Sequence, residues 1–154
     1  MKESFSNTVE VLCAPEEMYA YVTQPWLWHE WHPNSKSAKA KNSLLNVGDT
    51  FDEVVELQPF SPLPINMRRK THYQVVVANP STHWCVEGEM KGGWLKINYE
   101  FKPSKAGVTF TRTLSYEVSG INQLIFPLLK PRVRKMSLVA LSNLKAKLEK
   151  NTST

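Results

Sequence analysis

The sequence predicts an α+β fold in which a curved antiparallel sheet of seven strands wraps round one long C-terminal helix. From residue 36 to residue 118 apolar and polar side chains alternate, a pattern typical of strands that bury one face. The connections in this region are short, as expected when consecutive strands are antiparallel neighbours. After Gly120 the apolar period changes to that of an amphipathic helix.

The N-terminal part of the chain predicts one strand followed by two short helices. Residues 5–12 alternate and therefore predict a half-buried strand. Pro15 and the two acids after it predict a helix start, because proline loses no hydrogen bond there and acids favour the positive end of the helix dipole. A second short helical stretch begins at Pro25 and ends before Pro33.

The remaining elements follow from the change of period. Six further strands are expected, at residues 36–44, 48–57, 66–78, 82–90, 94–102 and 107–118. The long helix is expected to run to about Lys150, with a bend at Pro131. Its predicted core-facing stripe comprises Leu124, Leu128, Val133, Met136, Ala140, Leu144 and Leu148.

Length and composition narrow the class of protein. The 154 residues predict a single domain at residues 1–150, and residues 151–154 are expected to form a disordered tail. The longest apolar run has six residues, which excludes a membrane-spanning helix, and the N-terminus lacks the apolar core of a signal peptide, so we expect a cytoplasmic protein. Cys13 and Cys85 form no CxxC motif and are expected to be buried thiols.

Two segments and the order of elements resemble a known superfamily. Residues 11–33, which contain APEEMY and then TQPW, resemble its N-terminal signature, and the RTLSY strand at 112–116 followed by the long helix also matches. The chain is thus similar over nearly its whole length to the SRPBCC superfamily, which includes the Bet v 1-like, START-like and polyketide cyclase/dehydrase families. The resemblance implies the helix-grip fold with an apolar cavity between sheet and helix.

The resemblance also sets the functional hypotheses. The first is binding or transport of a hydrophobic small molecule, such as a lipid or a polyketide-like compound. An alternative is an enzyme similar to polyketide cyclases or dehydratases, and a further alternative is a protein-interaction module. The sequence contains no glycine-rich phosphate loop, GxSxG, CxxC or HExxH motif, so no cofactor and no metal are expected, and no catalytic residue is assigned.

Three charged residues fall on the apolar side of their predicted strands. By parity Glu53, Arg69 and Arg112 point inward, where Glu53 is expected to pair with one of the arginines and Tyr99 and Tyr116 to donate hydrogen bonds. Such a group suits a ligand carboxylate, phosphate or enolate. The alternatives are a purely structural ion pair and a register shifted by one residue, which turns all three outward.

The expected ligand-binding wall combines these residues with aromatic and apolar ones. Trp26 and Trp28 are placed at the pocket entrance, whereas Trp31 is expected to be structural. The complete set of candidate ligand-binding residues is Trp26, Trp28, Glu53, Arg69, Tyr73, Trp84, Tyr99, Phe110, Arg112, Tyr116, Leu128 and Met136.

The net charge of +5 permits an anionic partner. The apolar, proline-rich segment 59–65 and the basic segment 130–135 predict transient contact with an anionic membrane; the alternative is an ordinary hairpin tip over the pocket mouth. Nucleic-acid binding is not expected, because basic residues do not interleave with aromatic ones on a strand face. The sequence leaves open whether the protein is a monomer or a homodimer.

Overall fold

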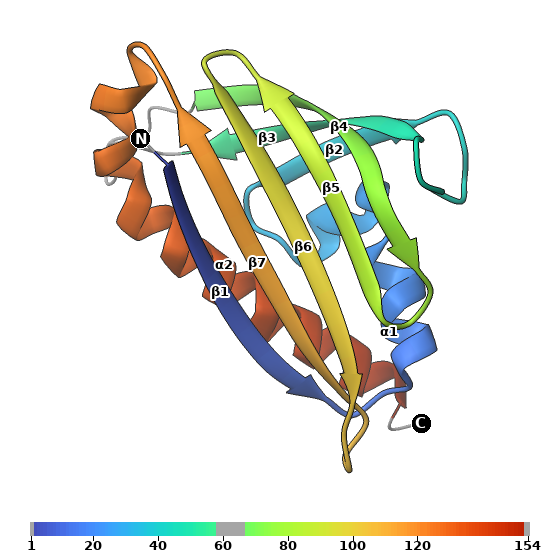
Figure 1. Cartoon of the computed structure of the whole chain (residues 1–154). Helices are drawn as coiled ribbons and strands as arrows, with labels where there is room; N and C mark the ends of the chain where they lie inside the picture. The colour runs from blue at the N-terminus through green and yellow to red at the C-terminus, as the bar shows by residue number, and fades with distance from the viewer. Residues whose placement is uncertain (1, 58–66, 153–154) are drawn as a thin grey trace.

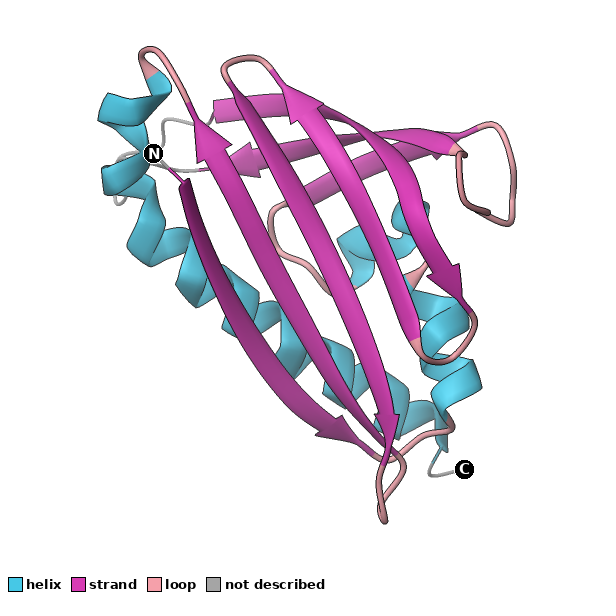
Figure 2. Ribbon diagram, viewed as in Figure 1, coloured by secondary structure: helices cyan, strands magenta, loops and turns pink. Residues whose placement is uncertain are grey.

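A computed structural model, which describes residues 2–57 and 67–152, shows an antiparallel sheet with all its helices on one side (Figures 1 and 2). The elements in chain order are β1 (Lys2–Val11), α1 (Pro15–Val22), the 3-10 helix η1 (Pro25–Glu30), β2 (Ser35–Ala40), β3 (Thr50–Leu57), β4 (Met67–Asn79), β5 (His83–Met90), β6 (Gly93–Pro103), β7 (Val108–Val118) and α2 (Asn122–Thr152). The predicted α+β class and the predicted order of elements are confirmed.

The seven strands form one sheet in the order β1-β7-β6-β5-β4-β3-β2. All six strand pairs are antiparallel, so β2 to β7 form the expected meander and β1 pairs with β7. The sheet is strongly curved, and α2 crosses its concave side (Figure 1). This topology separates β3 from β7 by three intervening strands while both face the helix.

The convex face of the sheet carries the polar half of the alternation. Where β1 pairs with β7, three hydroxyl pairs cross between the strands at 2.6–3.0 Å: Ser4 with Ser115, Ser6 with Thr113, and Thr8 with Thr111. Cross-strand hydroxyl pairs of this kind stabilise an exposed sheet surface. The polar residues predicted to face water on these strands therefore do so.

Helix α2 continues through Pro127 and Pro131, but its predicted core-facing stripe is partly wrong. Leu124 and Leu128 are 77% and 59% exposed, whereas Leu129 is buried. The first turns of α2 are apolar on both sides, so the period alone does not fix which side faces the sheet. None of the helices within the described ranges combines the length and apolar character needed to cross a membrane.

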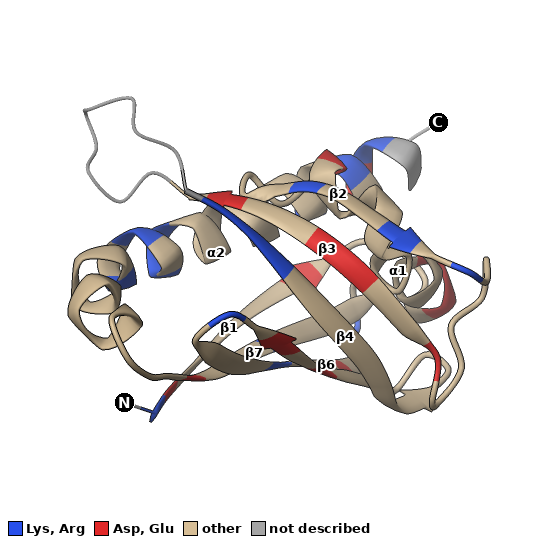
Figure 3. Ribbon diagram, turned by 90° about the horizontal axis from the view of Figure 1, so that it is seen from above, with Lys and Arg blue, Asp and Glu red and all other residues tan. Residues whose placement is uncertain are grey.

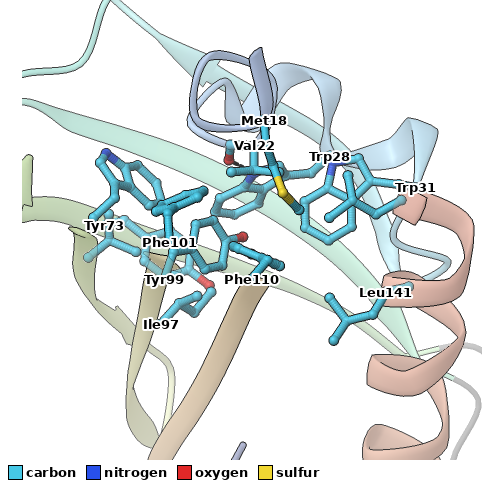
Figure 4. Close-up of a cluster of buried hydrophobic side chains, with 14 of the residues drawn as sticks. Met18, Val22, Trp28, Trp31, Tyr73, Ile97, Tyr99, Phe101, Phe110 and Leu141 are labelled. Atoms are coloured by element: carbon cyan, nitrogen blue, oxygen red, sulfur yellow. Dashed lines mark hydrogen bonds between the residues drawn. The ribbon is translucent and has the colours of Figure 1, made fainter. Parts of the chain in front are cut away.

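An aromatic cluster forms the main core beneath α1 and η1 (Figure 4). The Trp28 ring lies at its centre, edge-on to the rings of Phe51, Tyr73, Trp84 and Tyr99, with centroids 5.6–6.5 Å apart. Its indole Nε1 donates a hydrogen bond of 2.8 Å to the carbonyl oxygen of Val22 at the end of α1. Trp28 therefore joins the short helices to the sheet and does not lie at an entrance, so that prediction is wrong.

The two cysteines are the buried thiols that the sequence predicted. Cys13 and Cys85 are both free and are 4% and 1% exposed. Burial raises the pKa of Cys13 to about 11, and the nearby carboxylates of Glu17 and Glu149 act in the same direction. The Cys13 thiol therefore stays protonated at neutral pH and packs as a small apolar group.

Candidate functional site

A pocket lies between the concave face of the sheet and the N-terminal half of α2. It has a free volume of about 130 Å³, the same order as apolar cavities of about 150 Å³ that take up benzene. Inward-facing strand residues and one face of α2 supply its apolar wall, which includes Leu95, Ile97, Leu114, Val118, Ile125, Phe126, Leu129 and Val133. The free volume of the pocket is therefore close to that of a cavity that holds one aromatic ring.

One side of the pocket is polar, and Glu53 of β3 lies within it. Its side chain is buried and accepts hydrogen bonds from the Ser35 hydroxyl at 2.7 Å and the Tyr73 hydroxyl at 3.4 Å. Burial raises the pKa of Glu53 to about 7, and the two hydrogen bonds and the charge of Arg112 offset this only in part. The carboxyl group therefore changes its charge near neutral pH.

Arg112 of β7 enters the same side of the pocket from the opposite part of the sheet. It is 7% exposed, its Nη1 donates to the Ser137 hydroxyl of α2 at 3.2 Å, and its Nε has no hydrogen-bond partner. Since Glu53 and Arg112 are buried, the alternative of a shifted register is wrong. The predicted ion pair is also wrong, because neither Arg112 nor Arg69 has a nitrogen within 4.0 Å of a Glu53 carboxylate oxygen.

Three titratable groups that line the pocket, His32, Tyr73 and Tyr99, are neutral at physiological pH. Burial and the positive charge of Arg112 lower the pKa of His32 to about 3, and its Nδ1 accepts a hydrogen bond from the Asn34 N–H at 3.2 Å. The ring proton of His32 therefore resides on Nε2. Burial raises the pKa values of Tyr73 and Tyr99 above their ordinary range, so both keep their hydroxyl protons.

Trp31 lines the pocket, which the sequence did not predict. It is 1% exposed, and its indole Nε1 has no hydrogen-bond partner. Its carbonyl oxygen accepts a 3.1 Å hydrogen bond from Asn143, which connects the end of η1 to α2. The spacing of the two tryptophans was the available signal. Trp31 follows η1 and lies three residues after Trp28, which is one turn of a 3-10 helix, so both side chains point to the same side.

Half of the twelve candidate ligand-binding residues line the pocket. These are Trp28, Glu53, Arg69, Tyr73, Tyr99 and Arg112. The sequence reasoning missed His32 and Ser137 on the polar side and the α2 residues Ile125, Phe126 and Leu129. The α2 residues were missed because the predicted stripe was rotated about the helix.

The other six candidates lie outside the pocket wall. Trp84 and Phe110 are fully buried in the aromatic core, and Trp26 packs half-buried against it. The Tyr116 hydroxyl donates to Glu3 of β1 at 2.9 Å, so it does not join Glu53 and Arg112 as predicted.

On α2, Met136 is half-buried and Leu128 is exposed, and neither lines the pocket. The segment 59–65, to which a membrane contact was assigned, lies outside the described residues.

The pocket offers hydrogen-bonding groups and charges to a ligand. Within residues 2–57 and 67–152, no three His, Cys, Asp or Glu side chains lie close enough together to hold a metal ion. The polar side instead offers the cationic Arg112, the neutral donors Trp31 and Tyr99, and one carboxyl group that titrates near pH 7.

Comparisons with known proteins agree with this geometry. The sequence profile described as "Polyketide cyclase / dehydrase and lipid transport" matches residues 2–149. A protein from Chromobacterium violaceum is similar in structure, with a TM-score of 0.70, 15% identity, and coverage of 95% of this chain and 97% of that one. A protein from Thermus thermophilus has a TM-score of 0.70 and 12% identity, and the match covers 100% of both chains.

A third similar structure is that of a protein from a biosynthetic pathway. The di-domain ARO/CYC StfQ from the steffimycin biosynthetic pathway has a TM-score of 0.71 and 14% identity; the match covers 99% of this chain and 52% of StfQ. No curated protein matches the sequence. At these identities the structural likenesses establish the helix-grip fold.

Proposed function

The chain belongs to the polyketide cyclase/dehydrase and lipid transport family, and on this premise we propose that it binds an apolar small molecule in the pocket between the sheet and α2. The observation that carries the proposal is the pocket itself, whose wall is mostly apolar although it lies next to a densely packed aromatic core. The side chains that line an empty pocket lack packing contacts, and a bound apolar molecule supplies them.

The proposal is tested by filling the pocket. Val133 lines it from α2, so we expect Val133→Trp to weaken binding of the neutral fluorophore N-phenyl-1-naphthylamine at least tenfold, measured by its emission on titration. Leu138→Trp, at a position of α2 that is 58% exposed, is the matched control and should bind as the wild type does. Equal binding by Val133→Trp and the control would contradict the proposal.

A second candidate function is polyketide cyclisation, which Glu53 favours. A buried carboxyl group with a pKa near 7, hydrogen-bonded to a tyrosine in an apolar pocket, suits the transfer of protons to and from a substrate carbonyl. The family description includes polyketide cyclases, and the structural likeness to the ARO/CYC protein StfQ supports the same candidate. With a linear polyketide as substrate, Glu53→Gln should abolish cyclised product in chromatography while it still binds N-phenyl-1-naphthylamine. Unchanged product formation would remove this candidate.

We further propose that the outward face of the first turns of α2 docks on an anionic lipid bilayer. Ile121, directly before α2, and Leu124 and Leu128 in its first turns are 71%, 77% and 59% exposed. The exposed cations Arg134 and Lys135 follow them on the same helix, and Figure 3 shows the Lys and Arg of α2 beside its first turns. Apolar side chains next to cations suit the surface of an anionic bilayer.

The proposed docking face lies close to the ligand pocket, so docking would bring the pocket next to the bilayer. Ile125 and Phe126, in the same turns of α2, line the pocket, so a bilayer docked on these turns borders the ligand site. We expect binding to vesicles of phosphatidylcholine and phosphatidylserine in flotation, and little binding to phosphatidylcholine alone.

The double variant Leu124→Ser/Leu128→Ser should reduce flotation with the anionic vesicles at least fivefold. The matched control is Leu44→Ser/Val47→Ser, whose positions between β2 and β3 are 70% and 63% exposed. An equal loss in both double variants, or no flotation of the wild type, would contradict the proposed docking face.

A further inference from the structure

We infer that the ligand carries an anionic oxygen group, such as a carboxylate, that binds to Arg112 at the polar side of the pocket. This inference rests on the proposed function, binding of an apolar molecule in the same pocket. It adds the chemical class of the ligand: an amphiphile with one anionic end.

The charge of Arg112 is buried, and no carboxylate oxygen of the described residues lies within 4.0 Å of its nitrogens. The side chain is 7% exposed, and it donates hydrogen bonds to neutral groups, through Nη1 to the hydroxyl of Ser137 and also to that of Tyr99. Its Nε N–H, a strong donor, has no partner. A buried guanidinium group is unfavourable unless an anion pairs with it and its donors are satisfied, and a planar carboxylate satisfies two of these donors at once.

No anionic group of the described pocket wall is in direct contact with Arg112. Arg69 also lines the pocket, so it adds a second cation, while His32, Tyr73 and Tyr99 are neutral. The carboxyl group of Glu53 is more than 4.0 Å from the nitrogens of both arginines, and it accepts from Ser35 and Tyr73 instead. The described pocket wall therefore has an excess of positive charge.

Trp31, which also lines the pocket, carries a second hydrogen-bond donor without a partner. The Trp31 indole Nε1 is buried without a partner, and the Trp31 ring centroid is 6.1 Å from that of His32, the histidine that the charge of Arg112 influences. Two unpaired buried donors, one from β7 and one from the end of η1, thus belong to residues that line one pocket. Native proteins rarely leave such donors unsatisfied, and a ligand oxygen would satisfy them.

The opposite wall suits the rest of the molecule. Ile125, Phe126 and Leu129 of α2 are apolar and line the pocket. An amphiphile therefore binds with its anionic group at Arg112 and its apolar body against the N-terminal half of α2.

Glu53 gives the binding a pH dependence. When Glu53 is ionised it adds a negative charge that repels the ligand anion, and when it is protonated the repulsion is absent. The affinity for an anion should therefore rise as the pH falls from 8 to 6. Among the described groups of the pocket wall, His32, Tyr73 and Tyr99 stay neutral throughout this range, so they do not add to this pH dependence.

The experiment compares each of two carboxylates with its uncharged methyl ester: 2-naphthoate for aromatic acids and decanoate for fatty acids. Dissociation constants are measured by calorimetry at pH 6 and pH 8 for the wild type, Arg112→Met, Arg112→Lys and Glu53→Gln. We expect at least one acid to bind tenfold or more tightly than its ester at pH 6. Arg112→Met should remove this preference, Arg112→Lys should keep part of it, and Glu53→Gln should abolish the pH dependence.

The outcomes separate this inference from the proposed function. If the esters bind as tightly as the acids, or if Arg112→Met keeps the preference, the anionic group is contradicted while the apolar pocket stands. If neither acids nor esters nor N-phenyl-1-naphthylamine bind to the wild type, the proposed function itself fails. Circular dichroism of each variant checks that it folds, and Arg112→Lys covers the case in which Arg112→Met does not.

Discussion

The concave face of the sheet has a filled half and a hollow half, although the same strands run through both. In the filled half α1, η1 and the C-terminal part of α2 cover the sheet, and Ala140, Leu141, Leu144 and Leu148 of α2 are at most 4% exposed. In the hollow half the N-terminal part of α2 covers the sheet, and Phe126 is half-buried beside the pocket.

The contrast shows that the packing that stabilises the domain and the groups that suit ligand binding lie in different halves of the same face. The large rings of the filled half interlock with the short helices, whereas the hollow half combines smaller aliphatic side chains with the buried polar groups of Glu53 and Arg112. Tyr73 and Tyr99 belong to both halves, because their rings pack in the aromatic core and they also line the pocket. Substitutions should therefore act mainly on folding in one half and mainly on ligand binding in the other.

The largest effect is expected in the filled half, for Trp84→Ala. Trp84 is fully buried and its ring lies 5.3 Å from that of Tyr99 and 6.1 Å from that of Trp28. Removing it leaves a cavity and should lower the free energy of unfolding by about 3–5 kcal/mol, measured by urea denaturation. A loss below about 1 kcal/mol would mean that this half is not the main source of stability.

Glu53→Gln in the hollow half should stabilise the protein at high pH. Because burial raises the pKa of Glu53 from 4.5 to about 7, the folded protein holds a proton that the unfolded chain releases between these values. The contribution of this group to the free energy of unfolding is therefore fully present below pH 4.5. It is lost as the pH rises through 7 and stays absent at higher pH. The variant should exceed the wild type by about 2–3 kcal/mol at pH 8 and match it near pH 4.5 in urea denaturation. A variant less stable than the wild type at pH 8 would contradict the raised pKa.

Phe126→Ala, in contrast to Trp84→Ala, should weaken ligand binding more than it lowers stability. Phe126 is half-buried, packs against Tyr116 with ring centroids 4.6 Å apart, and lines the pocket. We expect a loss of about 1–2 kcal/mol in stability, since only part of the side chain is buried, together with at least fivefold weaker binding of N-phenyl-1-naphthylamine. A stability loss as large as that of Trp84→Ala would erase the distinction between the halves.

The smallest effect is expected for Leu128→Ala, on the outer side of α2. Leu128 is 59% exposed, and alanine has a high helix propensity, so the free energy of unfolding should change by less than about 0.5 kcal/mol. Leu129→Ala is the matched comparison: Leu129 is 3% exposed and its loss should reach about 2–5 kcal/mol. Equal losses at both positions would contradict the different burial of the two side chains.

Local sequence patterns predicted some parts of the site and not others. Glu53 and Arg112 were placed on the inner face, because alternation along a strand records which side each residue faces. Their ion pair was wrong, because β3 and β7 are separated by β4, β5 and β6, and parity carries no information about that separation. The face of α2 was wrong in its first turns because apolar residues occur there on both sides.

The sequence by itself determined the elements of this protein, their order and the inward position of its charged residues, since these depend on periodicity and on turn residues close by in the chain. Only the tertiary structure decided that the Arg112 Nε is buried without a hydrogen-bond partner among the described residues, that Trp31 lines the pocket and that half of the concave face is hollow. These features depend on distances between segments far apart in the chain, which are set by the curvature of the sheet and the rotation of α2 upon it.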